Sequence, residues 1–293
     1  MRILIVKLGS IGDVVHTLPA AAAIRRALPE AEISWVVERG GAAEILCGAE
    51  RNQFLRRLIV VDTKALRHQE SLGETLLIAR QQLRGLRASA FDIALDFQGL
   101  LKSAAITKLS KAKRRFGFAR AALREPTSRF LLTDTVSVPK KIHVIRKNLA
   151  LAEKALGISV PERDFEFPIF TDETDRREAD EIIERAGGDF TILNPAGGWA
   201  TKLWPAENFG ALADKLWKEF GLRSIVTTAS SENALAEKVL QNSRAGKIST
   251  ANPSLKGFYE LAKRARLYVG GDTGPTHLAA AARAPIVGIF GPT

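Results

Sequence analysis

The stretch that decides the fold is residues 1–19, MRILIVKLGSIGDVVHTLP. Its apolar run Ile3–Val6 predicts a buried strand, which a turn containing Gly9 and Gly12 joins to the start of a helix. The order strand, turn, helix is that of a nucleotide-binding loop, but the spacing does not match G-x-G-x-x-G and Asp13 lies in the first helical turn. Because a carboxylate there would repel a pyrophosphate, the stretch predicts an open α/β fold whose first loop does other chemistry.

Asp13 has two interpretations. Its side chain would point out of the carboxyl end of the sheet, into the crevice where open α/β folds bind ligands, and a carboxylate held there suits a general base. Asp also favours helix starts, where it interacts with the positive end of the helix dipole, so a helix cap explains it equally well. Spacing alone leaves both open.

Composition limits the class of protein. The chain has 293 residues, 46% of them hydrophobic, which suits two domains rather than one. Its 43 Lys and Arg against 32 Asp and Glu leave a formal charge of +11, which favours anionic partners. The single cysteine, Cys47, excludes an internal disulfide and a Cys-rich zinc site. With no charged and apolar leader and no run of about 18 uncharged apolar residues, we expect a soluble, cytoplasmic protein.

Short apolar runs alternate with amphipathic segments along the chain, which is typical of parallel sheets covered by helices on both faces. We expect two doubly wound domains, residues 1–158 and 169–293, joined by the proline-flanked stretch Ile158–Pro168. Residues 111–141 are basic and weakly periodic, and we expect a lobe or loop region there. The chain stops at Thr293 directly after an apolar run, so we expect the second domain to be truncated at its C-terminus.

In the second domain, residues 268–280, YVGGDTGPTHLAA, predict a strand, a glycine turn and a helix start. The free amides of Thr273 and Gly274 would face an anion such as a diphosphate. Asp272 would accept hydrogen bonds from sugar hydroxyls, and His277 would donate to a phosphate or sugar oxygen. Taken singly, Asp272 is explained by a helix cap and His277 by a satisfied helix histidine, but together with the glycines they favour a binding site.

Two further residues follow strands of the second domain. Lys202, after the Gly197-Gly198 turn, could neutralise a departing diphosphate without a metal, although a surface lysine is the simpler explanation. Glu232 follows the run Ser224–Thr228, at a position where an acid commonly binds ribose hydroxyls, and a cap by the adjacent Ser231 is the alternative.

In the first domain, Asp96 ends a strand and a helix follows it, so Gln98, Lys102 and Ser103 could meet an acceptor near Asp13. A basic group further on could hold phosphate or carboxylate, although such a run is usually a solvated face. Its members are Arg114, Arg115, Arg120, Arg124, Lys140, Lys141 and His143.

Over essentially its whole length the chain resembles glycosyltransferase family 9, and most closely its lipopolysaccharide heptosyltransferase I branch. The resemblance depends on an ordered set of motifs: KLGSIGDVVHTLPA from Lys7, WVVE from Trp35, DFQGLLKSAA from Asp96, REP from Arg124, KLWP from Lys202 and GGDTGPTHLAAA from Gly270. It implies a GT-B fold, two Rossmann-like domains facing across a cleft that holds the active site. It also implies ADP-heptose as donor and a Kdo residue of the lipid A inner core as acceptor.

The resemblance also implies roles for individual residues. Asp13 would be the general base of an inverting transfer. Donor contacts would come from Lys202, Thr273 and Gly274 at the diphosphate, from Asp272 and His277 at the sugar or phosphate, and from Glu232 at the ribose. Acceptor contacts would come from Gln98, Lys102, Lys64, Arg67, Arg120, Arg124 and His143.

The same resemblance implies no metal and no other cofactor, because a lysine and a helix end replace the charge of a divalent ion. It implies peripheral attachment to the anionic cytoplasmic face of the inner membrane, and no nucleic acid partner. The loop AGGWAT before Lys202 departs from the family's pattern, which leaves the phosphate contacts there unaligned.

Three alternatives compete with this interpretation. Another family 9 transferase, such as heptosyltransferase II, would keep the fold and the donor but change the acceptor, and His16-Thr17-Leu18-Pro19 favours the first branch. A nicotinamide-dependent oxidoreductase is disfavoured by the missing G-x-G-x-x-G. A basic protein that binds nucleic acid or membrane without catalysis would leave the strand-end motifs of both domains unexplained.

Overall fold

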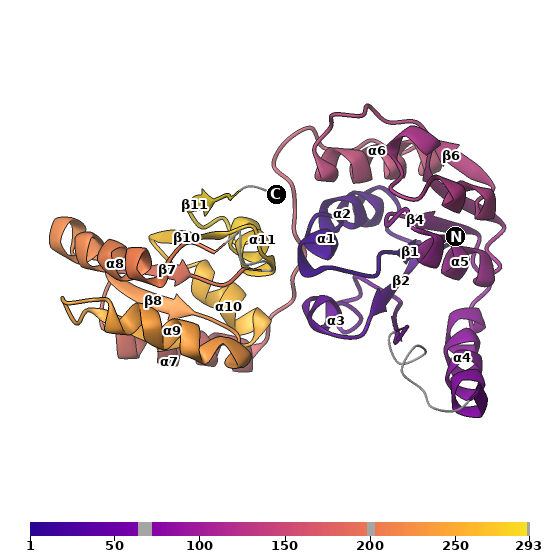
Figure 1. The fold of residues 1–293 in the computed structure, drawn as a ribbon. Coiled ribbons are helices and arrows are strands. Elements are labelled where there is room, and N and C mark those ends of the chain that lie inside the picture. The colour runs from indigo at the N-terminus through magenta and orange to yellow at the C-terminus, as the bar shows by residue number, and fades with distance from the viewer. Residues whose placement is uncertain (64–71, 198–202, 292–293) are drawn as a thin grey trace. The chain divides into compact units, whose positions relative to one another are not determined.

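Two parallel β-sheets, each in its own unit of the chain, form the framework of the protein (Figure 1). The computed structural model describes residues 1–63, 72–197 and 203–291. The chain divides between Phe170 and Thr171, close to where the sequence predicts the second domain to begin.

In the described part of the chain the first sheet has six strands in the order β3-β2-β1-β4-β5-β6, and every pairing is parallel. This is the strand order of a doubly wound dinucleotide-binding sheet, in which the order reverses between β1 and β4. The strands are β1 (Arg2–Val6), β2 (Glu32–Glu38), β3 (Arg57–Val61), β4 (Ile93–Asp96), β5 (Arg114–Phe118) and β6 (Asp134–Val136).

Helices connect these strands and cover the sheet. They are α1 (Ile11–Val15), α2 (Leu18–Ala27), α3 (Gly41–Leu46), α4 (Leu72–Arg87), α5 (Leu101–Leu109) and α6 (Val144–Leu156), with short 3-10 helices η2 (Arg120–Ala122) and η3 (Pro126–Leu131). The helix α2 packs on α6, and α4 packs on α5. Parallel strands joined by helices need both faces covered, which explains why β1 is apolar at every position from Ile3 to Val6.

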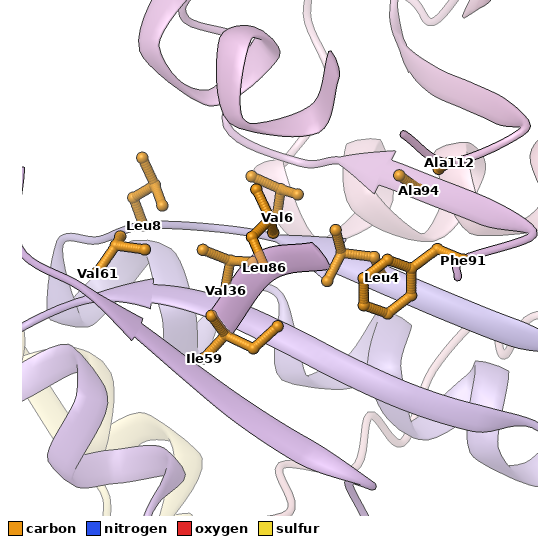
Figure 2. Packing of buried hydrophobic residues seen from close by; sticks show 10 residues of the cluster. All are labelled: Leu4, Val6, Leu8, Val36, Ile59, Val61, Leu86, Phe91, Ala94 and Ala112. Atoms are coloured by element: carbon orange, nitrogen blue, oxygen red, sulfur yellow. The ribbon is translucent and has the colours of Figure 1, made fainter. Parts of the chain in front are cut away.

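One face of the first sheet forms a continuous apolar core, shown in Figure 2. Leu4 and Val6 of β1 point to this face, because alternate residues of a strand share a face. They pack with Leu86 of α4 and with side chains from the neighbouring strands. The complete cluster consists of Leu4, Val6, Leu8, Val36, Ile59, Val61, Leu86, Phe91, Ala94 and Ala112.

The second sheet repeats the arrangement in the order β11-β10-β7-β8-β9, with all described pairings parallel. Its order reverses between β7 and β10, so each unit has one switch point of its own. The strands are β7 (Phe190–Asn194), β8 (Arg223–Thr227), β9 (Ile248–Ala251), β10 (Leu267–Gly271) and β11 (Ile286–Ile289).

The helices of the second unit are α7 (Glu173–Ala186), α8 (Ala206–Phe220), α9 (Asn233–Gln241), α10 (Leu255–Ala262) and α11 (Gly274–Ala281), with the 3-10 helix η5 (Ser230–Glu232). The amphipathic helix α8 places Phe209, Ala213 and Leu216 against Leu193 and Val226 of the sheet. This second core is separate from the first, as the length and hydrophobic content predict. No helix in the described ranges is long and apolar enough to span a bilayer.

The expectation for residues 111–141 is wrong. This stretch is not an irregular lobe, because β5 and β6 extend the first sheet by two strands, with η2 and η3 between them. Neither strand has a continuous apolar run, because β5 begins with two arginines, one exposed and one half-buried, and β6 has only three residues.

Candidate functional site

Several charged side chains of the first unit lie at the switch point of its sheet. The chain leaves β1 through Lys7 and the turn to α1, and it leaves β4 through Phe97 and Gln98. Because β1 and β4 are paired neighbours, these segments meet at the same edge. The Gln98 side-chain oxygen accepts a hydrogen bond from the Leu8 amide at 3.1 Å, which ties the two loops together.

Asp13 lies in α1 at this edge, with 38% of its side chain exposed. One carboxylate oxygen, Oδ2, accepts a hydrogen bond from the Ser10 amide at 3.1 Å. The other, Oδ1, lies 3.4 Å from the Lys7 Nζ. Asp13 therefore caps the helix start through the Ser10 amide and is also open to solvent, so the geometry is compatible with both interpretations made from the sequence.

Lys7 is the buried partner of this carboxylate. Only 4% of Lys7 is exposed, and its Nζ donates a hydrogen bond to the Phe97 carbonyl oxygen at 3.2 Å. Burial lowers the pKa of Lys7, and the negative charge of Asp13 opposes that shift. The Asp13 carboxylate thus stabilises the charged form of Lys7.

Asp96 is the last residue of β4 and directly precedes Phe97 and Gln98 of the site. It is buried, and its Oδ1 accepts hydrogen bonds from the amides of Gln98 and Gly99, at 2.9 and 3.1 Å. The Ser103 hydroxyl donates to its Oδ2 at 3.0 Å. Burial raises the pKa of Asp96 to about 6, against the opposing effect of these hydrogen bonds and of Lys7.

A small cavity of about 140 Å³ adjoins Asp13 and is rich in cations. Lys7, Arg124 and Lys147 line it together with Gln98 and Asn148. Burial lowers the pKa of Lys147, and the nearby charge of Lys7 lowers it further. The excess of positive charge suits a ligand that carries an anionic group.

The turn between β1 and α1 also lines a wider hollow of about 430 Å³. Gly9, Ser10, Gly40 and Gln98 line part of it, and Lys102 provides a cation.

Lys102 is held in place there by Glu38. The Lys102 Nζ lies 2.7 Å from the Glu38 carboxylate and 2.6 Å from the Thr63 hydroxyl. Burial alone would raise the pKa of Glu38, but hydrogen bonds from Lys102 and Thr63 outweigh it and the pKa is lowered.

The structure brings Asp13, Gln98, Lys102 and Arg124 together at this edge of the first unit. Lys64 and Arg67 lie outside the described residues. Arg120 begins η2 and is exposed. His143 is the N-cap of α6, where its Nδ1 accepts a hydrogen bond from the Ile145 amide at 3.3 Å, which supports a capping role.

Ser103 does not meet the prediction that it faces an acceptor. It is fully buried, and its hydroxyl bonds Asp96 and the Leu100 carbonyl oxygen. Its role is to fix the start of α5.

In the second unit, β10 ends at the glycine turn and α11 begins with Gly274. Thr273 is the N-cap of α11 and has an extended backbone, so the first amides of the helix are left without intrahelical partners, as expected at a helix start. The Asp272 Oδ1 lies 3.5 Å from the His277 Nε2, so these two predicted residues lie side by side. Thr276 donates to the Gly271 carbonyl oxygen and contacts the Tyr268 hydroxyl, which fixes the turn.

Of the remaining donor residues, Lys202 lies outside the described residues. Glu232 ends η5 and accepts a hydrogen bond from the Ala229 amide at 3.1 Å, so it supports the local turn. The described residues contain no cluster of His, Cys, Asp and Glu that could hold a metal ion.

Four residues of the first unit's site were missed from the sequence: Lys7, Glu38, Lys147 and Asn148. For Lys7 and Glu38 a signal was present, because each is a charged residue at the carboxyl end of an apolar strand, the criterion that drew attention to Asp13. Lys147 and Asn148 lie on α6, far away in sequence, and only the fold brings them near β1.

The fold and the strand-end sites place the chain among proteins with two Rossmann-like domains, and comparison with known proteins identifies the class. Residues 79–293 match the model of glycosyltransferase family 9 (heptosyltransferase). The chain therefore belongs to glycosyltransferase family 9, and it is an enzyme of the glycosyltransferase class.

Individual relatives match over the full length of the chain. It is 30% identical to lipopolysaccharide heptosyltransferase 1 of Pseudomonas aeruginosa, covering 100% of this chain and 79% of the relative. It is 29% identical to the protein of the same name from Escherichia coli K12, covering 100% and 88%. Among solved structures, E. coli heptosyltransferase WaaC with ADP-2-deoxy-2-fluoro heptose aligns with a TM-score of 0.84 at 28% identity, covering 100% of this chain and 90% of that one.

These findings confirm the resemblance drawn from the sequence motifs, and they confirm the GT-B class with its two Rossmann-like domains. They also exclude the two alternatives of another class, the nicotinamide-dependent oxidoreductase and the non-catalytic basic protein.

Proposed function

We propose that this enzyme transfers a heptosyl residue from ADP-heptose to a Kdo residue of the lipid A inner core, with inversion at the sugar carbon. The names of its relatives, lipopolysaccharide heptosyltransferase 1, and the WaaC structure with an ADP-heptose analogue support this substrate pair. The observation that carries the mechanism is Asp13: a partly exposed carboxylate at the switch point of the first sheet, held from one side by Lys7.

In this reaction the acceptor hydroxyl oxygen forms a bond to the anomeric carbon of the heptose. The bond between that carbon and the diphosphate oxygen breaks, and ADP leaves with the electron pair. Asp13 takes the proton of the attacking hydroxyl, which is general base catalysis and contributes about 10²–10⁴-fold in rate.

The second unit holds the donor in this proposal. The amides at the start of α11, at Thr273 and Gly274, face the diphosphate, and Asp272 and His277 contact the donor sugar or phosphate. Lys202 neutralises the departing diphosphate and Glu232 binds the ribose. No divalent metal and no other cofactor takes part.

The first unit binds the acceptor. Lys102 lines the wider hollow and Arg124 lines the smaller one, and Gln98 lines both. We assign acceptor contacts to these three residues together with Lys64, Arg67, Arg120 and His143. The enzyme works at the anionic cytoplasmic face of the inner membrane, attached peripherally through its positive charge.

Replacement of Asp13 tests the base assignment. We expect Asp13→Asn to lower kcat at least about a hundredfold, because the proton acceptor is lost. Binding of ADP, measured by calorimetry, should change less than about twofold, because the donor contacts are assigned to the second unit. A variant that transfers heptose at the wild-type rate would show that Asp13 is not the base.

Substrate profiling tests the donor and the acceptor. The wild-type protein is incubated with ADP-heptose and a series of truncated lipid A cores, and the products are identified by mass spectrometry. We expect transfer to a core that ends in Kdo. Transfer only to a core that already carries heptose would instead assign the activity of heptosyltransferase II, and transfer only from another nucleotide sugar would contradict the donor.

A further inference from the structure

Lys7 has an environment unlike that of the other cations in the chain. Of the lysines and arginines that the structure describes, it is the only buried one, with 4% of its surface exposed. Burying an ammonium group costs free energy unless the group is paired and hydrogen-bonded, so the partners of Lys7 indicate its role.

The backbone of Lys7 is fixed by the neighbouring strand. Its amide donates to the Val36 carbonyl oxygen at 3.2 Å, and its own carbonyl oxygen accepts from the indole Nε1 of Trp35 at 3.1 Å. Trp35 is fully buried, so Lys7 projects from a rigid part of the sheet. At the end of the side chain, the hydrogen bond to the Phe97 carbonyl oxygen sets the position of Nζ.

The ammonium is placed to act on Asp13. The Lys7 Nζ lies 3.4 Å from Asp13 Oδ1, while the Ser10 amide holds Oδ2. The backbone of Asp13 is fixed as well, because its carbonyl oxygen accepts from the Thr17 hydroxyl at 2.8 Å and Asn148 donates to that hydroxyl at 3.1 Å. Protein groups therefore hold both carboxylate oxygens and the main chain of the proposed base in place before any substrate binds.

We propose that Lys7 is a positioning residue for the transfer reaction: its buried ammonium orients the Asp13 carboxylate, and it acts on the reaction only through Asp13. This inference rests on the proposed function. The other charged groups facing the pair are Asp96 from the end of β4, Lys147 from α6 and Arg124 from the segment after η2. Lys7 differs from Lys147 and Arg124 in its direct contact with the carboxylate.

The first experiment replaces Lys7 by methionine, which keeps an unbranched chain but removes the charge. We expect kcat to fall about tenfold to a hundredfold, because the carboxylate loses the contact that holds its Oδ1 in position for proton transfer. The KM for ADP-heptose should stay within about twofold, because the donor contacts are assigned to other residues. The matched control is Lys113→Met, which removes the lysine of an exposed pair with Asp92 at 2.8 Å and should leave kcat unchanged.

The second experiment combines the change with Asp13→Asn. If Lys7 acts only through Asp13, adding Lys7→Met to Asp13→Asn should not lower the residual rate further. A further drop of about tenfold or more would overturn the proposal, because Lys7 would then act directly on substrate. An unchanged kcat in the single variant Lys7→Met would overturn it too.

Thermal melting without substrate separates this proposal from the proposed function. Each single variant leaves one buried or half-buried charge without its partner, so we expect the double variant to melt at a higher temperature than the sum of the two losses predicts. If the losses in melting temperature of the two single variants were additive in the double variant, the ion pair would be contradicted, irrespective of which substrate the enzyme uses. A wild-type protein that transfers no heptose while the melting losses are non-additive would contradict the proposed function, and with it the role of Lys7 in transfer, but not the pair itself.

Discussion

The Asp96 carboxyl group shows how a single buried charge links the site to stability. It interacts electrostatically with Lys7, and it fixes the turn before α5 by accepting a hydrogen bond from the Gln98 amide. Its native pKa of about 6 is above its ordinary value of 3.8, because burial penalises the charged form more than the hydrogen bonds favour it. The native protein therefore binds this proton more tightly than the unfolded chain does.

We predict that Asp96→Asn gains stability relative to the wild type as the pH rises from about 4 to about 7. Below about pH 3.8, Asp96 is protonated in both the native and the unfolded wild type, and its contribution to the free energy of unfolding is fully present. Between 3.8 and about 6 the unfolded state ionises first, so that contribution is lost as the pH rises through the native pKa. The loss amounts to about 3 kcal/mol at most, and urea unfolding at about pH 4.5 and about pH 7.5 measures it.

Asparagine keeps an acceptor for the Gln98 and Gly99 amides, and Ser103 can still donate to the Leu100 carbonyl oxygen. The control is Asp92→Asn, at a carboxylate whose pKa is lowered to about 2 by hydrogen bonds from Lys113 and Arg2. That group is ionised in both states above about pH 5, so its variant should show no comparable change between about pH 5 and 7. Equal pH dependence of the wild type and Asp96→Asn would contradict the assignment.

For individual residues, the sequence predicted where a side chain lies in the fold better than it predicted its hydrogen-bond and ion-pair partners. The strand-end rule placed Asp13 at the edge of the sheet, and the structure has it there. The pairing of Lys7 with Phe97, and the support of Asp13 by Asn148 through Thr17, join residues about 90 and 130 positions apart. Such contacts depend on the packing of β4 and α6 against β1, which no local pattern in the sequence encodes.

Two glycines that lie within helices differ in the space available for a side chain. Gly85 in α4 has open space where a Cβ would be, whereas a Cβ on Gly210 in α8 would lie 2.6 Å from the Asn242 carbonyl carbon and 2.7 Å from its oxygen. Those atoms are backbone at the end of α9, so they cannot move aside as a flexible side chain could.

We predict that Gly85→Ala stabilises the protein by about 0.5–1 kcal/mol, through the higher helix propensity of alanine. Gly210→Ala should instead destabilise it by about 1–3 kcal/mol, because overpacking against α9 exceeds the gain in propensity. Urea midpoints of the two variants measure the contrast. If both variants were stabilised to the same degree, close approach would not be the reason for a glycine at position 210.

Elements were predictable where the sequence was apolar and continuous. The strands β1, β2 and β7 are almost entirely buried, and their apolar runs locate them. The strands β5 and β9 carry polar residues because they lie near or at the edge of a sheet, so the same criterion misses them. The strand β6 is both short and at the edge.

At the scale of the whole molecule, alternating apolar runs and helices predicted two doubly wound units, and the two parallel sheets confirm this. The order of strands within each sheet could not be derived in the same way. It follows from right-handed crossover connections and from which edge each new strand joins, which are properties of packing rather than of any one segment.

The last prediction concerns net charge. The chain carries +11, and exposed cations Arg120, Arg124, Lys140 and Lys141 follow the two outer strands β5 and β6 of the first unit. We expect the protein to bind vesicles that contain phosphatidylglycerol and to be released as salt rises from about 50 to about 500 mM, because screening weakens attraction to the anionic surface.

Charge reversal tests where this attraction lies. Each basic residue near an anionic membrane contributes about 1 kcal/mol, so Lys140→Glu with Lys141→Glu should weaken sedimentation with these vesicles by about tenfold or more. The control, Lys215→Glu with Lys218→Glu, makes the same change in net charge at exposed positions of α8 in the second unit. A larger loss for the Lys140 and Lys141 variant than for the control would assign membrane contact to the first unit, the unit to which we assign the acceptor. Equal losses would show that net charge alone governs binding, and binding to neutral phosphatidylcholine vesicles at high salt would contradict the electrostatic origin altogether.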